Sequence, residues 1–215
     1  MAQEMEGLNN RRDGGSSHEL SPSVVYIEAC ENYQKQSYRN RCRFLAADGV
    51  QSLSFPIVHE GGTHKLPISE IKIDWSTPWL IQHKRAIISA YRTSAYFEYY
   101  QDELFEILDR RHERLLDFNM DILRFFIEKT GIAIDLRLTE EYSRDAVITP
   151  ADGSSIVCDD LREIIHPKRP DTILKDLDLE KAYFQVFTRK HAFQSNLSIM
   201  DLLFNEGPDS ICYLK

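Results

Sequence analysis

The chain has 215 residues, a formal net charge of −8 and an isoelectric point near 5.4. With 42% hydrophobic and 28% charged residues, it has the composition of a globular protein with one large core. An acidic chain is a poor candidate for a general nucleic-acid binder, which usually carries a basic surface. No apolar run approaches the roughly 20 residues that span a bilayer, and residues 1–20 lack the apolar core of a signal peptide. We therefore expect a cytoplasmic protein without a transmembrane segment.

Residues 1–22 are polar and rich in turn-forming residues, which predicts a disordered or atypical N-terminal segment before a single domain over residues 23–215. The four cysteines are scattered and form no C-x-x-C pair. Reduced thiols are the expected state in a cytoplasmic chain, and we expect no metal site.

The first half of the domain predicts short strands. Residues 24–27 begin one strand, residues 38–46 form a second, and residues 51–58 return antiparallel to it. The dipeptide Asp48-Gly49 between the last two is a strong hairpin signal. Residues 70–74 read as a further short strand.

Helices dominate the second half. Apolar periodicity predicts helices over residues 78–91, 94–108 and 118–129, and Gly131 is a suitable residue to end the third. Ser198 and Asp201 form a helix-start signature ahead of an apolar run that Gly207-Pro208 closes. Three further segments are predicted as a strand over 132–138, a short helix over 159–165 and a strand over 183–187. The fold class is α/β: one domain with a mixed sheet, including the antiparallel hairpin, covered by three to four helices.

The stretch from Glu31 to Arg43 concentrates hydrogen-bonding side chains. On an extended strand Arg39, Arg41 and Arg43 share one face, where three guanidinium groups form a site for phosphate or carboxylate. The alternative is a solvated face of an edge strand, where charges deter aggregation. The local cations on an acidic chain favour a small anionic ligand.

Other side chains of this stretch complete the predicted substrate-binding set. The amide of Asn40 is suited to sugar hydroxyls or a base edge, whereas Asn32 also fits turn capping. Lys35 and Tyr38 belong to the same predicted site.

Two histidines are candidate acid–base residues. His83 shares a helix face with Trp79, and a partly buried structural histidine is the competing interpretation. His191 follows Arg189-Lys190, and no carboxylate partner is assignable to it. His59 and His64 are only a weak metal signal, because no third ligand has suitable spacing.

Four stretches, in order, resemble the WbqC-like proteins in the form common in Bacteroidetes. The resemblance covers roughly residues 26–214. Its stretches are Glu31–Cys42, Ser89–Tyr91 with Ser94–Tyr100, Asp117–Asn119, and Tyr183–Phe187 followed by Asn196–Pro208. The family usually opens with a strand and a turn rich in proline and aromatic residues, for which residues 1–25 have no counterpart.

The resemblance implies a bacterial protein of O-antigen and other surface-polysaccharide biosynthesis. The first hypothesis is a transferase-type enzyme acting on a phosphorylated or nucleotide-linked sugar; the second is a non-catalytic binding or scaffold protein of the same pathway. A concave pocket that gathers Asn40, Arg41 and either His83 or His191 favours the enzyme, whereas a flat arginine face favours the scaffold. The sequence specifies neither a cofactor nor an oligomeric state.

Overall fold

The structure is a computed structural model that describes residues 23–59, 65–150, 153–162, 164–168 and 172–214. The predicted N-terminal segment, residues 1–22, lies outside the described residues.

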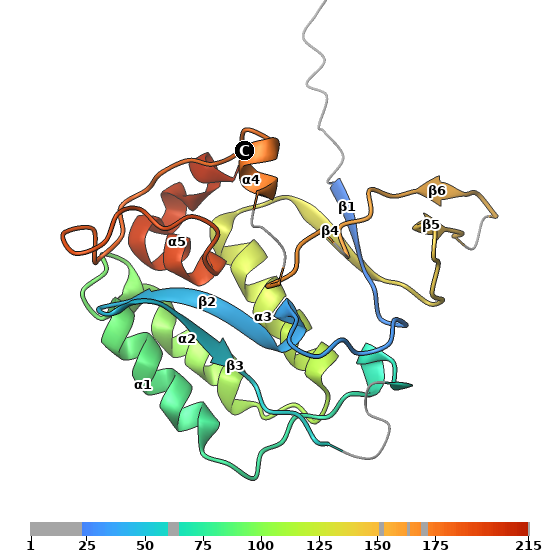
Figure 1. Ribbon diagram of the computed structural model, residues 1–215, viewed down its shortest axis with the longest axis horizontal. Helices are drawn as coiled ribbons and strands as arrows, with labels where there is room; N and C mark the ends of the chain where they lie inside the picture. Colours follow the sequence, from blue (N-terminus) through green and yellow to red (C-terminus); the bar gives the residue numbers. More distant parts are fainter. Residues whose placement is uncertain (1–22, 60–64, 151–152, 163, 169–171, 215) are drawn as a thin grey trace, which may run out of the picture.

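The predicted hairpin is confirmed and forms the front of the molecule (Figure 1). Strand β2 (Arg41–Ala46) pairs antiparallel with β3 (Gly49–Ser54), with Arg41 opposite Ser54 and Ala46 opposite Gly49. Ala47 and Asp48 form the two-residue turn. Gly49 follows it at a φ of +106°, a backbone conformation that glycine adopts without steric cost.

The remaining strands pair elsewhere. Strand β1 (Ser23–Ile27) runs parallel to β4 (Ile134–Leu138), and the short β5 (Val147–Ile148) pairs antiparallel with β6 (Ile156–Val157). Within the described residues the strands thus form three two-stranded sheets, and the α/β class is confirmed with both parallel and antiparallel pairs. The expected mixed sheet is divided into these three ladders.

Helices α1 (Trp79–Tyr91), α2 (Phe97–Asp109) and α3 (Leu115–Thr130) lie where the apolar periodicity predicts them. Gly131 ends α3 in the left-handed conformation, with a φ of +71°. Helix α5 (Ile199–Glu206) begins with Ser198, whose hydroxyl accepts a hydrogen bond from the Met200 amide. Helix α4 (Ile173–Asp176) and the 3-10 segments η1 (Tyr38–Asn40), η3 (Ile68–Glu70) and η4 (Gly207–Tyr213) are short.

Several local predictions are wrong. Residues 38–40 form η1 instead of extending β2, because the Ser37 hydroxyl accepts from the Arg39 amide and caps a tight turn. The described residues of 159–165 form turns, not a helix, and residues 183–187 form no strand. The short strand predicted over residues 70–74 is reduced to single bridges, which join Ile73 to Ile57 and Lys72 to Arg114.

The core lies between the hairpin and the helices. Phe44 of β2 and Leu53 of β3 pack with the buried faces of α1, α2, α3 and α5. Phe118 and Leu203 are completely buried at its centre. In Figure 1 the hairpin crosses in front of α1 to α3, and α5 lies beside β2. A hydrogen bond from the Ser198 amide to the Arg43 carbonyl, 2.8 Å long, attaches the start of α5 to the outer edge of β2.

Candidate functional site

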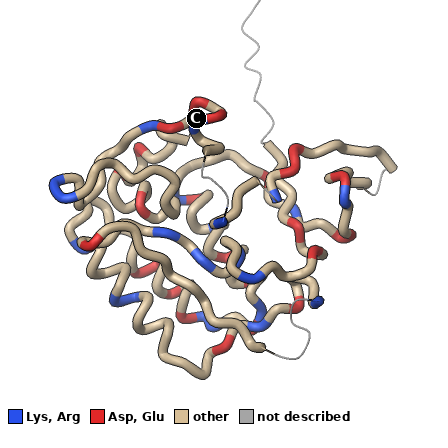
Figure 2. Tube along the Cα trace, in the orientation of Figure 1, with Lys and Arg blue, Asp and Glu red and all other residues tan. Residues whose placement is uncertain are grey.

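The outward face of the hairpin carries two of the three predicted arginines. Arg41 and Arg43 alternate with the core-facing Cys42 and Phe44 on β2, and basic residues mark this strand in Figure 2. Their antiparallel partners Ser54 and Ser52 share that face, because opposite residues of a ladder project to the same side. The Arg41 Nε donates to the Ser54 Oγ at 3.1 Å. Two guanidinium groups and two hydroxyls therefore lie on one rigid surface.

Arg39 does not belong to this strand face. It lies in η1, where its guanidinium forms a two-point ion pair with Glu31. Its carbonyl accepts a hydrogen bond from the Asn119 side chain of α3, at 2.7 Å. The expectation that three arginines line one strand face is thus wrong for Arg39, because the 3-10 turn rotates it out of the alternation.

The predicted polar residues near the cations divide into a structural and an exposed set. The Asn40 amide donates to the Phe55 carbonyl at 2.7 Å, and the Phe55 amide donates to the Asn40 carbonyl at 2.9 Å, so Asn40 extends the hairpin pairing. Asn32 and Lys35 are exposed, and Asn32 forms a single backbone bridge with Pro67. A substrate-binding role for these three residues stays a prediction.

His83 lies on α1 inside an aromatic cluster. Its ring centre is 5.1 Å from that of Trp79 and 5.7 Å from that of Phe55. The Nδ1 atom is buried and has no hydrogen-bond partner in the described structure. Burial lowers the pKa of His83 to about 4, so the imidazole is neutral at pH 7. This environment is that of a packed structural histidine.

His191 lies at the other end of the hairpin. One ring nitrogen, Nε2, is 3.0 Å from the carbonyl oxygen of Ala47 in the β2–β3 turn. From Arg41 to Ala46 the strand rises five residues, which is about 17 Å at 3.3 Å per residue. His83, beside Phe55, and His191, at the turn, are therefore held at opposite ends of the ladder. The fold does not bring them to one catalytic centre.

Tyr38 lies at the start of η1 and lines a cavity of about 270 Å³. The other residues that line it are Leu161, Ile164, Ile165, His166, Thr172, Ile173, Asp176 and Leu177. A second cavity of about 260 Å³ is lined by residues from Leu174 to Leu214, including Tyr183 and Ser198. Neither His83 nor His191 lines either cavity.

Asp201 is a buried hydrogen-bonding centre that the helix-start interpretation missed. The residue is 1% exposed, and its carboxylate accepts from the hydroxyls of Tyr91 and Tyr183, each at 2.8 Å, and from the Gln185 side-chain amide at 3.1 Å. Burial raises the pKa of Asp201, and the three donors act against that shift. This network joins α1, the 183–185 segment and α5. The signal available in the sequence is the co-occurrence of these residues in two of the stretches that carry the family resemblance.

Another polar cluster joins α2 to α3. The Oδ2 atom of Asp121 accepts from Arg110 at 2.9 Å and lies 2.8 Å from the His112 Nε2. Within the described part of the chain, no group of three histidine, cysteine or acidic side chains is arranged to hold a metal ion. In the same part of the chain, no helix has the length and apolar character needed to cross a membrane.

Comparison with known proteins places these features in a family context. The sequence model of the WbqC-like protein family matches residues 21–161. An uncharacterized protein of Mycobacterium tuberculosis (strain ATCC 25618 / H37Rv), Rv1507c, is 25% identical over 206 residues, which cover 89% of this chain and 87% of that protein. No solved structure matches the chain. The matched region contains the hairpin and both of its outward arginines.

Proposed function

This chain belongs to the WbqC-like protein family, and from that premise we propose that it acts in bacterial surface-polysaccharide (O-antigen) biosynthesis as a transferase-type enzyme. Its substrate in this proposal is a phosphorylated or nucleotide-linked sugar whose phosphate binds Arg41 and Arg43.

The observation that carries the proposal is the outward face of the hairpin. Arg41 and Arg43 are two residues apart on one strand, so their Cα atoms are about 7 Å apart. A planar guanidinium group is the side chain best suited to bind an oxyanion through parallel donors. The hydroxyls of Ser52 and Ser54 add donors on the same face. Because the hairpin is paired along its whole length and packed on the core, the backbone that carries these donors is fixed before a ligand binds.

The second candidate function is a non-catalytic binding or scaffold protein of the same pathway. The positions of His83, in an aromatic cluster, and of His191, at the hairpin turn, favour it, because the two histidines are held at opposite ends of the hairpin and form no acid–base pair with each other. In that case the arginines bind the ligand, or an acidic partner, without chemistry.

Isothermal titration calorimetry with nucleotide sugars and sugar phosphates tests the binding proposal. Loss of one charge-assisted contact costs about 1.5–3 kcal/mol, so Arg41→Ala is expected to weaken binding about 10- to 100-fold. Arg85→Ala, at an exposed arginine of α1, is the matched control and is expected to leave affinity unchanged. Equal affinity of wild type and Arg41→Ala contradicts the proposed site. Incubation of the protein with a sugar donor and acyl or aminoacyl co-substrates, followed by mass spectrometry, distinguishes the two functions. Formation of a modified sugar supports the enzyme, and binding without product supports the scaffold.

A further inference from the structure

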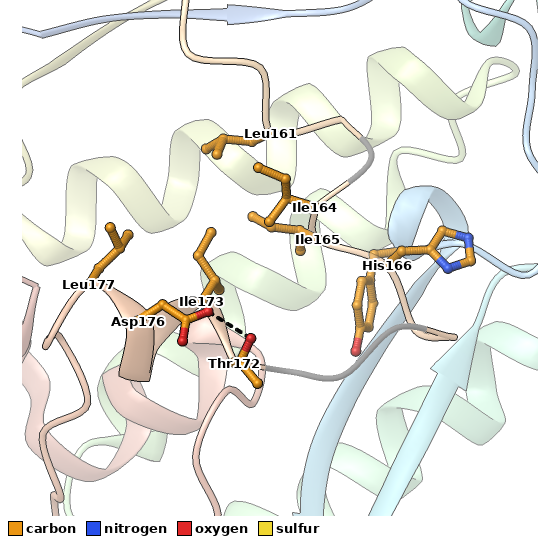
Figure 3. A pocket seen from close by; sticks show the side chains of 9 residues that line it. Leu161, Ile164, Ile165, His166, Thr172, Ile173, Asp176 and Leu177 are labelled. Carbon is orange, nitrogen blue, oxygen red and sulfur yellow. Dashed lines mark hydrogen bonds between the residues drawn. The ribbon is translucent and has the colours of Figure 1, made fainter.

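The cavity next to Tyr38 has aliphatic walls on two sides (Figure 3). One wall is formed by Leu161, Ile164 and Ile165, and the amides of Ile164 and Ile165 donate to the Leu161 carbonyl at 3.2 and 3.3 Å. This turn presents three aliphatic side chains, each between 43% and 50% exposed. Exposed aliphatic residues gathered in one hollow, as opposed to scattered singly, mark a binding surface.

The opposite wall is helix α4. Ile173 and Leu177 are four residues apart and therefore share a face, which points to the same space as Ile164 and Ile165 in Figure 3. Leu177 is 59% exposed although it lines the cavity. An aliphatic ligand lying between the two walls removes this surface from water.

Two polar interactions at the cavity already occupy lining side chains. The Thr172 hydroxyl donates to the Asp176 carboxylate at 2.8 Å, and the His166 Nδ1 accepts from the Lys168 amide at 3.1 Å. A nucleobase bound here cannot use these groups as hydrogen-bond partners. Burying its unsatisfied donors and acceptors costs binding free energy. A hydrocarbon chain has no such requirement.

The turn that forms the first wall is anchored from behind. Arg162 forms a two-point ion pair with Asp160 and a 3.2 Å bond to the Glu28 carboxylate, at the end of β1. The guanidinium also contacts the Tyr142 ring, 5.2 Å from its centre. The side chain of Arg162 therefore fixes the turn while its neighbour Leu161 lines the cavity.

The cavity adjoins the arginine strand through Tyr38. The Arg41 amide donates to the Tyr38 carbonyl, which closes the 3-10 turn of η1. Three residues of 3-10 helix rise about 6 Å. Tyr38, which lines the cavity, and Arg41, the first cation of β2, therefore lie at the two ends of one tight turn. An apolar hollow beside paired cations is complementary to an amphiphile with an anionic head.

We propose that this cavity binds the hydrocarbon chain of a lipid-linked phosphate, such as an isoprenyl phosphate carrying the sugar, while Arg41 and Arg43 bind its phosphate. The inference rests on the proposed function and specifies its substrate class: a lipid-linked sugar, as opposed to a nucleotide-linked one. The chain length that enters is short, because a cavity of about 270 Å³ lies just below the usual range for ligand pockets.

Calorimetric titration below the critical micelle concentration tests the proposal with three probes: farnesyl diphosphate, inorganic diphosphate and a uridine diphosphate sugar. Farnesyl diphosphate is expected to bind at least tenfold more tightly than inorganic diphosphate, since each buried methylene strengthens binding about fourfold. Leu177→Ser and Ile164→Ser are expected to remove most of this advantage while leaving the affinity for inorganic diphosphate unchanged. Val157→Ser, at a 79% exposed apolar residue of β6, is the control and is expected to bind as wild type.

The outcomes separate the two proposals. If inorganic diphosphate binds through Arg41 but the farnesyl chain adds nothing, or if both cavity variants bind like the control, the lipid inference is overturned and the anion site stands. Tighter binding of the uridine diphosphate sugar than of farnesyl diphosphate also overturns it. If no probe binds, or if binding is indifferent to Arg41→Ala, the proposed function itself fails and the inference with it.

Discussion

Acidification tests the environment of His83 directly. The folded protein holds this imidazole with a pKa of about 4, lowered by burial, whereas an unfolded chain protonates histidine near pH 6.5. Between those two pH values the unfolded state therefore binds more protons than the folded state. The contribution of neutral His83 to the free energy of unfolding is complete above about pH 6.5 and is lost as the pH falls towards 4. At about 1.4 kcal/mol per pH unit, the loss amounts to about 3 kcal/mol across this window.

Urea unfolding of wild type and His83→Leu, followed by circular dichroism at several pH values between 7 and 4, measures this contribution. Other groups also titrate in this range, so the informative quantity is the difference between the two proteins. The wild type is expected to lose about 2–3 kcal/mol more than His83→Leu on going from pH 6.5 to pH 4. Gln82→Leu, at the exposed neighbouring position of α1, removes no titrating group and is expected to follow the wild type.

Parallel stability curves for wild type and His83→Leu refute the reasoning. Parallel curves mean that His83 has the same pKa in the folded protein as in the unfolded chain. In that case a proton donor or solvent reaches the Nδ1 atom. That result also restores His83 as a candidate acid–base residue, because a general base works best with a pKa near the working pH.

Two further predictions concern the core and the backbone. Tyr91→Phe removes a hydrogen bond to a buried carboxylate and is expected to cost about 1.5–3 kcal/mol in urea unfolding, whereas Tyr99→Phe, at a 78% exposed ring, is expected to cost under about 0.5 kcal/mol. Equal stability of the two variants speaks against the buried network. Gly207→Ala is expected to lower the melting temperature clearly more than Gly131→Ala: both glycines have positive φ, but a Cβ at Gly207 meets the Tyr96 ring at 2.5 Å, whereas at Gly131 it meets open space. A larger effect at Gly131 contradicts the packing around Gly207.

Elements specified by local signals were predictable from the sequence. The hairpin marked by Asp48-Gly49, the apolar stripes of α1 to α3 and the glycine after α3 are each encoded within a few residues, although the turn itself is formed by Ala47 and Asp48. Alternation on β2 correctly placed Arg41 and Arg43 on one face. In each case the physical cause is a neighbouring residue or a helical repeat.

Features that depend on distant residues were not predictable. β1 pairs with β4 across more than a hundred residues, and no local pattern specifies that partner or its parallel direction. The hydroxyl of Ser37 overrides the extended pattern at Arg39, which turns a predicted strand cation into the partner of Glu31. No local sequence pattern around His83 or His191 predicts that they lie at opposite ends of the hairpin. The aliphatic cavity joins Leu161, Ile164 and Ile165, predicted as part of a short helix, to α4, for which no local pattern predicts an element.

The Ser198–Arg43 hydrogen bond has a consequence for how the protein can be divided. The family match ends at residue 161, yet α5 starts from the edge of β2 and inserts Met200, Leu203 and Phe204 into the common core. A fragment cut at residue 161 leaves the apolar surfaces of α1, α2 and α3 without their cover and the Tyr91 hydroxyl without its acceptor. The cooperative folding unit is therefore larger than the segment by which the family is identified, and expression trials that trim the chain to that segment are expected to produce insoluble material.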